Sequence, residues 1–184
     1  GAGSIGPGWG NGKATAVVYA RQGAKIFAVD INLDAAAETA AIIAAEGGEA
    51  MAFAADVTKP AHVAAMVEAC MTKFGRIDVL HNNVGGVGPG RALETVTEDD
   101  WYETFDINVT SAFLTCKAVV PIMADQGGGA IVNISSIGGI RHLSVPMTTY
   151  ATGKGALNEL TRNIALQYAS KKIRANCVLP GYID

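Results

Sequence analysis

Residues 1–6, GAGSIG, have the GxGxxG spacing of a turn that binds the pyrophosphate of a dinucleotide, and Gly8, Gly10 and Gly12 follow at once. Glycines let the backbone approach the phosphates, which then meet the amide-rich start of the next helix. On its own this spacing is common among glycine-rich turns. Here a helical pattern runs from Lys13 to Gly23, and the apolar residues 24–30 then predict a buried strand. This order of turn, helix and strand favours a dinucleotide site.

The predicted strand ends at Asp30, an acidic residue about 20 positions beyond the glycines. A carboxylate there accepts hydrogen bonds from both ribose hydroxyls of an adenosine and repels a 2′-phosphate. No Arg or Lys follows closely to offset that repulsion, so NAD is expected as the cofactor and NADP is less favoured. The alternative is that Asp30 only caps the turn.

Apolar runs and helical patterns alternate along the rest of the chain. Strands are expected at residues 49–56, 77–82, 130–135 and 174–179, and helices at 33–46, 60–74 and 149–169. A further long helix is expected to begin after an N-cap at Thr97 and to include about residues 102–124. This alternation predicts an α/β fold, a Rossmann-type doubly wound parallel sheet with helices on both faces in three layers. No linker or charge run marks a boundary, so residues 1–184 are expected to form one dinucleotide-binding and catalytic domain.

The composition limits the classes of function. Of the 184 residues 49% are hydrophobic and 17% charged, and the net charge of −3 favours neither nucleic acid nor an anionic membrane. No apolar run is long enough to span a bilayer. The three cysteines lie far apart without metal or redox spacing, which favours reduced thiols and a cytoplasmic location. No His, Cys and carboxylate group has metal-ligand spacing, so no metal is expected.

Tyr150 and Lys154 are four residues apart at the start of a predicted helix, so their side chains lie on one face. A free phenol, with a pKa near 10, is a poor base at pH 7, and a neighbouring cation favours the phenolate that proton abstraction requires. Ser136 ends a predicted strand, where its hydroxyl can bind a substrate oxygen. A Tyr-x-x-x-Lys pair alone often belongs to an ordinary exposed helix start. The serine and the upstream turn make an accidental match less plausible.

These motifs together resemble the common branch of the short-chain dehydrogenase/reductase family. The matching positions are the glycine-rich turn, Asp30, Asp56-Val57, Asn82-Asn83-Val84-Gly85, Asn108, Ser136, Tyr150 with Lys154, and Asn176 with Pro180-Gly181. The resemblance implies NAD-dependent interconversion of a secondary alcohol and a ketone. It implies that Tyr150 is the acid/base, Ser136 positions the reacting oxygen, Lys154 binds the nicotinamide ribose and favours the phenolate, and Asn108 holds a relay water.

The resemblance also implies a set of cofactor contacts. Gly1, Gly3, Ser4, Gly10 and Gly12 would form the phosphate turn. Further contacts are expected from Asp30, Asp56, Val57, Asn83, Val84, Gly85, Pro180 and Gly181, besides Tyr150 and Lys154.

Three departures from the family pattern stand out. The pattern TGxxxGxG fits only if Gly10 and Gly12 are its last glycines, which leaves an insertion at about residues 5–9. Val84 replaces the usual Ala. The sequence also begins at the motif's glycine and ends just after Pro180-Gly181, so we expect part of a longer chain. A strand before Gly1 would be central in a 3-2-1-4-5-6 sheet.

Other interpretations remain open at this point. Epimerase/dehydratase relatives share Tyr-x-x-x-Lys, and a non-catalytic NAD-binding sensor is a third class. Arg141 and His142, between Ser136 and Tyr150, either bind a polar or acidic part of the substrate or form a solvated loop. A homodimer or homotetramer is expected, because residues 102–124 and 149–169 carry more apolar side chains than one sheet-facing stripe needs: Phe113, Leu114, Val119, Val120, Met123, Leu157, Leu160, Ile164 and Leu166.

Overall fold

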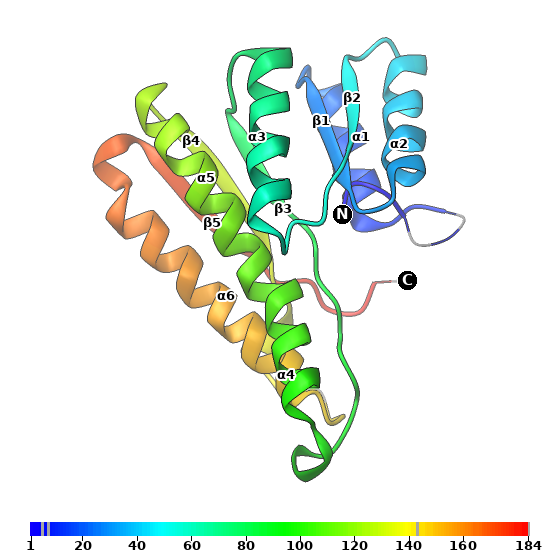
Figure 1. Cartoon of the computed structure of the whole chain (residues 1–184), viewed down its shortest axis with the longest axis vertical. Helices are drawn as coiled ribbons and strands as arrows, with labels where there is room; N and C mark the ends of the chain where they lie inside the picture. The colour runs from blue at the N-terminus through cyan, green and yellow to red at the C-terminus, as the bar shows by residue number, and fades with distance from the viewer. Residues whose placement is uncertain (5, 7, 143, 184) are drawn as a thin grey trace. The chain divides into compact units, whose positions relative to one another are not determined.

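The structure is a computed structural model that describes residues 1–4, 6, 8–142 and 144–183. Parallel strands alternate with helices along the chain (Figure 1), as the sequence predicts. The chain divides into two compact units, Gly1–Arg76 and Ile77–Asp184, each of which is described by itself. The expectation of one domain over residues 1–184 stays a prediction.

The first unit holds two parallel strands and three helices. Its elements are α1 (Asn11–Arg21), β1 (Ile26–Asp30), α2 (Leu33–Ala45), β2 (Ala50–Ala54) and α3 (Pro60–Phe74). β1 pairs with β2 in parallel, from Ile26 opposite Ala50 to Asp30 opposite Ala54.

Successive β1 side chains point to opposite faces, and each face has its own helices. Ile26 and Ala28 belong to a buried cluster with Val17 of α1 and Ile43 of α2. Phe27 instead packs against Phe53 and Phe74, with ring centroids 5.5 Å and 6.4 Å away. Helices thus cover both faces, and this unit has the expected three layers.

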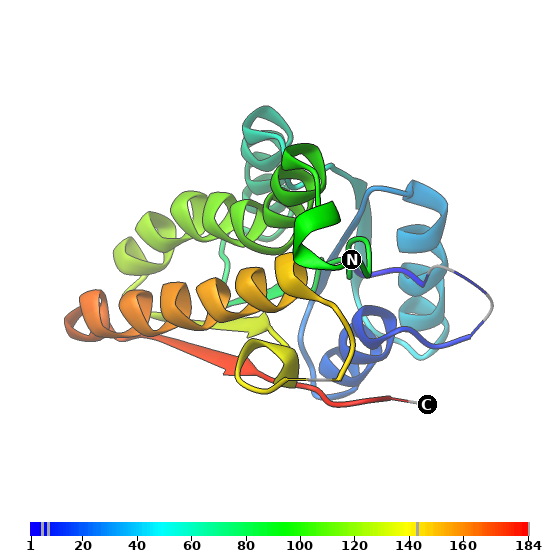
Figure 2. The ribbon, with the colours of Figure 1, turned by 90° about the horizontal axis from the view of Figure 1, so that it is seen from below.

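The second unit holds the three-stranded parallel sheet β3-β4-β5. Its strands are β3 (Val79–Asn82), β4 (Gly129–Ile134) and β5 (Ile173–Val178); its helices are α4 (Glu98–Phe105), the π-helical turn η2 (Asp106–Thr110), α5 (Ser111–Asp125) and α6 (Thr148–Gln167), with short 3₁₀ turns η1 (Leu93–Thr95), η3 (Ile137–Gly139) and η4 (Ala169–Lys171). Figure 2 shows α5 and α6 side by side along this sheet.

A line of buried polar side chains shows that α5 and α6 pack on the same face. Asn82 and Asn133 are partners in the sheet register, and the Asn82 amide donates to Asn133 Oδ1 at 2.8 Å. Thr115 of α5 donates to Asn82 at 2.8 Å, and Asn133 donates to Thr161 of α6 at 2.8 Å. On the opposite face Val178 is half exposed, so within the described part of this unit the helices cover one side of the sheet.

Each unit has its own sheet. In the described residues β1 pairs only with β2 in the first unit, whereas β4 pairs with both β3 and β5 in the second. The Ala2 N–H donates to the Val29 carbonyl at 2.9 Å, so the first residues run beside the end of β1.

Residues Glu98–Asp125 form one continuous helix of 28 residues, through α4, the π-helical turn and α5. Its most apolar 18 residues have a mean hydropathy of 1.5, so by length and composition alone the helix could cross a membrane. No apolar run of that length was expected from the sequence. Of that window 44% is buried in the protein. Val119, Val120 and Met123 are core residues, and a core helix passes the same test.

Candidate active site

In the glycine-rich turn, Gly3 and Ser4 pack closely against Gly10. A β-carbon at Gly3 would overlap the Ala35 methyl group, and one at Gly10 would lie 3.4 Å from both the Gly3 carbonyl and Ser4 Oγ. Gly3 and Ser4 therefore lie next to Gly10, although five residues separate Ser4 from Gly10 in the sequence. Of the predicted insertion at residues 5–9, Ile5 and Pro7 lie outside the described residues.

The amino end of α1 is open to an anion. Its N-cap is Gly10, so no side chain caps the first amides, and its first turn holds no acidic residue. Uncapped N–H groups at the positive end of a helix bind phosphate oxygens. The close backbone approach at Gly3 and Gly10 and these free amides fit the pyrophosphate of a dinucleotide.

Asp30, at the end of β1, is tied to the turn through both carboxylate oxygens. Oδ2 accepts the Gly3 N–H at 3.0 Å, and Oδ1 accepts the Asn32 N–H at 3.0 Å. Burial alone would raise the pKa of Asp30, but the Asn32 and Gly3 N–H groups hold it below the usual value. Asp30 thus caps the turn, as the alternative interpretation required. A carboxylate has about four acceptor positions, so it can still accept ribose hydroxyls.

Asp56 and Val57 lie just beyond β2, in a turn that is closed by side-chain hydrogen bonds. Asp56 Oδ1 accepts both the Thr58 N–H at 2.9 Å and the Thr58 hydroxyl at 2.6 Å, and these bonds hold the pKa of Asp56 low. The Asp56 N–H donates to Nδ1 of His62 at 3.2 Å. The carboxylate is therefore ionised and held at the edge where β2 ends.

In the second unit, Ser136 follows β4 and is buried. Its Oγ accepts the Gly138 N–H at 3.1 Å, which leaves the hydroxyl hydrogen free to point to a ligand. The neighbouring Ile137 N–H donates to the Pro180 carbonyl at 3.0 Å. The sequence motifs at Ser136 and Pro180-Gly181, far apart in the chain, are thus brought side by side.

Lys154 is a buried cation beside Tyr150. Its side chain is only 4% exposed, and its ammonium lies 5.7 Å from the centroid of the Tyr150 ring. Nζ donates to the Ile134 carbonyl at 2.8 Å. Burial lowers the pKa of Lys154 to about 8, although the neighbouring Cys177 opposes that shift. An ammonium this poorly hydrated interacts strongly with any negative charge nearby.

Gly85 lies between Lys154 and Asn108, with Asn83 and Val84 connecting it to β3. A β-carbon at Gly85 would lie 2.9 Å from both Lys154 Nζ and Asn108 Oδ1. The Asn108 side chain binds both backbone polar groups of Gly86, the residue after Gly85. Its Nδ2 donates to the Gly86 carbonyl at 2.7 Å, and its Oδ1 accepts the Gly86 N–H at 3.3 Å. Asn108 is fully buried in the π-helical turn, a feature frequent at functional sites.

Residues outside the predicted catalytic and cofactor-binding set hold these groups in place. The Ser135 hydroxyl donates to the Lys154 carbonyl at 3.1 Å. A β-carbon at Gly139 would lie 2.9 Å from the Lys154 carbonyl carbon and 3.0 Å from the Gly155 nitrogen. The available signal was a second serine before Ser136 and a glycine in the turn that follows it.

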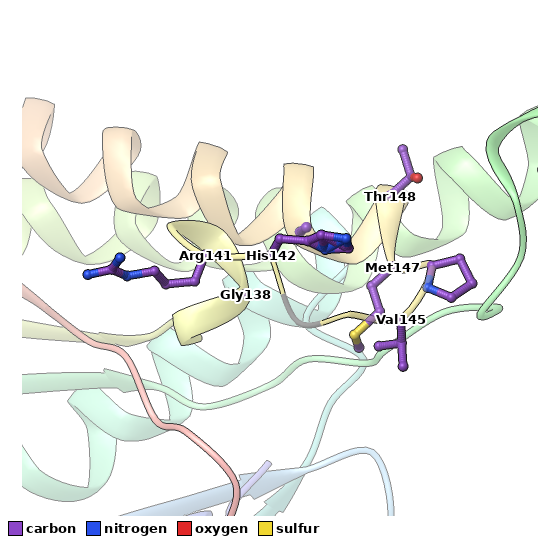
Figure 3. Close-up of a pocket in the computed structure, with 8 residues that line it drawn as sticks. Gly138, Arg141, His142, Val145, Met147 and Thr148 are labelled. Carbon is purple, nitrogen blue, oxygen red and sulfur yellow. The ribbon is translucent and has the colours of Figure 1, made fainter.

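A cavity of about 260 Å³ lies between α6 and the loop that follows η3 (Figure 3). It reaches from Gly138, whose N–H binds Ser136, to Ala151, next to Tyr150. The other lining residues are Arg141, His142, Val145, Pro146, Met147 and Thr148. Figure 3 shows the guanidinium of Arg141 extended away from Val145 and Met147, with the His142 ring on their side.

The sequence and the fold of this chain both match known proteins. Residues 4–184 match the family model described as short chain dehydrogenase. The chain belongs to this family. It is 38% identical over 178 residues to the cyclohexanol dehydrogenase of Acinetobacter sp. (strain SE19), covering 97% of this chain and 70% of that enzyme.

Two of the similar solved structures contain a bound nicotinamide cofactor. NAD⁺-bound xylitol dehydrogenase is 37% identical, with a TM-score of 0.90, and the match covers 94% of this chain and 66% of that one. The 7α-hydroxysteroid dehydrogenase complexed with NADH and 7-oxo glycochenodeoxycholic acid is 35% identical, with a TM-score of 0.89, covering 94% and 67%. The fold is thus the Rossmann fold of short-chain dehydrogenases, and the chain is an oxidoreductase of the class that acts on CH–OH groups.

Proposed function

We propose that this short-chain dehydrogenase interconverts a secondary alcohol and a ketone with NAD, and that Tyr150 is the acid/base. The observation that carries the proposal is the buried ammonium of Lys154, 5.7 Å from the Tyr150 ring. A desolvated cation next to a phenol favours phenolate, the form that accepts a proton.

In the oxidation direction, the alcohol proton passes to the phenolate oxygen of Tyr150. Ser136 donates its free hydroxyl hydrogen to the reacting oxygen and keeps it in place. A bound NAD would supply the acceptor for the hydride of the alcohol carbon. In the reduction direction the Tyr150 hydroxyl returns the proton to the ketone oxygen. The balance is one hydride and one proton in each direction.

Several residues are suited to hold the cofactor. The uncapped start of α1 and the close approach at Gly3 fit the pyrophosphate, and the ionised Asp30 fits the adenosine ribose and disfavours a 2′-phosphate. Lys154 and Gly85 would border the nicotinamide ribose, and Asn108 would carry the relay water. These assignments make NAD the favoured cofactor over NADP.

The cavity beside the loop suits the part of the substrate beyond the reacting carbon. Its lining joins the apolar Val145, Pro146 and Met147 to the His142 ring. The Ser144 N–H donates to His142 Nδ1 at 3.3 Å, which places the proton of a neutral ring on Nε2. We therefore favour an apolar secondary alcohol with a second oxygen that accepts this N–H.

The deciding experiment follows NADH formation with a panel of secondary alcohols, with and without a second oxygen acceptor, and repeats it with NADP. Turnover of some of these alcohols with NAD, and much less with NADP, is expected. Binding of NADH without turnover of any alcohol would favour a non-catalytic sensor. The buried Lys154 speaks against that class, because a cation costs free energy to bury.

A further inference from the structure

Lys13, in the first turn of α1, is a nearly fully buried lysine at the cofactor end of the first unit. Only 2% of the residue is exposed. Its ammonium donates to the Gly8 carbonyl at 3.1 Å and to Glu38 Oε1 of α2 at 2.8 Å. Its burial is not predictable from the sequence alone, since lysine in a first helical turn is ordinarily solvated.

A second ion pair also joins α1 to α2 and shows that burial is not needed for this purpose. Arg21, at the far end of α1, pairs with Glu46 at 2.6 Å, and its side chain is 55% exposed. At the Lys13 pair, by contrast, the cation is buried while the Glu38 carboxylate is 62% exposed. Burying a cation against a solvated partner is costly, so a link between helices does not explain Lys13.

The Gly8 contact links Lys13 to the insertion in the glycine-rich turn. Gly8 has φ of +125°, a conformation that favours glycine, and it lies within the stretch between Ser4 and Gly10. The Gly8 carbonyl accepts its bond from the Lys13 ammonium, while no side chain caps the first amides of α1. An ammonium has three N–H donors, and the described residues supply two acceptors.

We infer that Lys13 is a positioning residue for the pyrophosphate of the cofactor. It fastens Gly8 so that the amides at the start of α1 stay open, and it adds a buried positive charge to the first turn of that helix. The inference rests on the proposed function, because it requires that the glycine-rich turn binds a dinucleotide.

The test measures dissociation constants for NADH, ADP-ribose and AMP by calorimetry on the purified full-length protein, unmodified and in four variants. Lys13→Met should weaken binding of NADH and ADP-ribose by about tenfold, as expected for a lost charge-assisted contact. AMP, which lacks the pyrophosphate, should lose much less. Lys13→Arg should restore most of the affinity, and Glu38→Gln should retain it, because the Gly8 bond survives.

Arg21→Met is the matched control, since it removes the other ion pair between the same two helices. It should leave all three dissociation constants unchanged. Equal losses in Lys13→Met and Arg21→Met, or equal losses for AMP and ADP-ribose, would reduce Lys13 to a structural link and overturn the inference. If the unmodified protein bound neither NADH nor ADP-ribose, the cofactor assignment itself would fail. Normal NADH binding by Lys13→Met would defeat this inference alone.

Discussion

The ammonium of Lys154 donates its hydrogen bond to the backbone carbonyl of Ile134, at 2.8 Å, while it faces the ring of Tyr150. Ile134 is the last residue of β4 and lies two positions before Ser136 in the chain. Its carbonyl thus fixes the position of the Lys154 ammonium of α6. The positions of the proposed base and of the serine are therefore set by the same strand end. This arrangement makes specific changes in the site measurable.

Replacing Tyr150 with Phe keeps the ring against Lys154 but removes the hydroxyl. Without a group to take the alcohol proton, kcat should fall by about 10²–10⁴. NADH binding, followed by fluorescence titration, should stay close to that of the unmodified enzyme. Near-normal turnover by this variant would mean that another group is the base.

The lowered pKa of Lys154 has a consequence for stability in the absence of cofactor. Its pKa is about 8 in the folded protein and 10.5 as the ordinary value, so between these pH values the unfolded chain binds more protons. The free energy of unfolding should therefore rise with pH from about 8 to about 10.5, by at most about 3 kcal/mol from this group. Below pH 8 both states are protonated and this contribution is flat.

Lys154→Met isolates that contribution, because methionine fills similar space and does not titrate. The difference between the urea unfolding free energies of the two proteins should change over this pH range. A constant difference from pH 7 to pH 10.5 would contradict the assignment of a lowered pKa to Lys154.

Asp30→Ala should narrow the preference for NAD over NADP, since it removes the charge that repels a 2′-phosphate. The ratio of kcat/KM for the two cofactors should drop by about tenfold or more. Asp30 also accepts the Gly3 and Asn32 N–H groups, each through a different oxygen. Asp30→Asn is therefore the closer variant, because it removes the charge, keeps the side-chain shape and retains one of the two acceptor oxygens. Equal use of both cofactors by the unmodified enzyme would rule the assignment out.

Gly139→Ala should disturb the contact between the Ser136 turn and α6. The added methyl group would press on the backbone at Lys154 and Gly155, which should cost about 1–3 kcal/mol of stability and lower kcat. Gly90→Ala is a suitable control, because a β-carbon there would meet only the Pro146 carbonyl, at 3.6 Å. If both variants behaved like the unmodified enzyme in thermal unfolding and kcat, the tight contact would be unimportant.

A homo-oligomer stays a prediction, but its expected surface is narrower than the sequence indicated. Five of the apolar residues are buried in the core of the second unit and cannot contact a partner subunit: Val119, Val120, Met123, Leu157 and Ile164. Phe113 and Leu166 are exposed, at 44% and 72%.

Light scattering should give the mass of a dimer or tetramer at micromolar concentration. Leu166→Glu should reduce that mass, and Gln167→Glu, on the same helix, should not. A monomeric mass for the unmodified protein would end this prediction.

Much of the fold follows from local sequence signals. Helix α3 spans Pro60–Phe74 as predicted, because Pro60 suits the first turn and Gly75 ends the helix with φ of +73°. Thr97 caps α4 in a capping box with Asp100, as expected of Thr97. The strands match within about two residues, since their apolar runs are bounded by polar and turn residues.

The misses depend on contacts between distant residues. No local pattern predicts the π-helical turn around Asn108, which depends on how the helix packs over Gly86. The burial of Lys13 depends on Gly8 and Glu38, and the Asn82–Asn133 pair on strand register. Spacing along the chain identifies the groups proposed to react, whereas the groups that support them become visible only after folding.

The proposed site needs the π-helical turn at Asp106–Thr110, an irregular part of an otherwise α-helical segment. A turn of i to i+5 bonds accommodates one more residue than an α-helix, and each residue of an α-helix rotates the following side chains by about 100°. Deleting one residue from Asp106–Thr110 would give a regular helix in which α4 and α5 keep their packed sides, but it would remove the wider turn that carries Asn108. Asn108 would then lose its bonds to Gly86. The most regular version of this helix is therefore the one least able to support the chemistry.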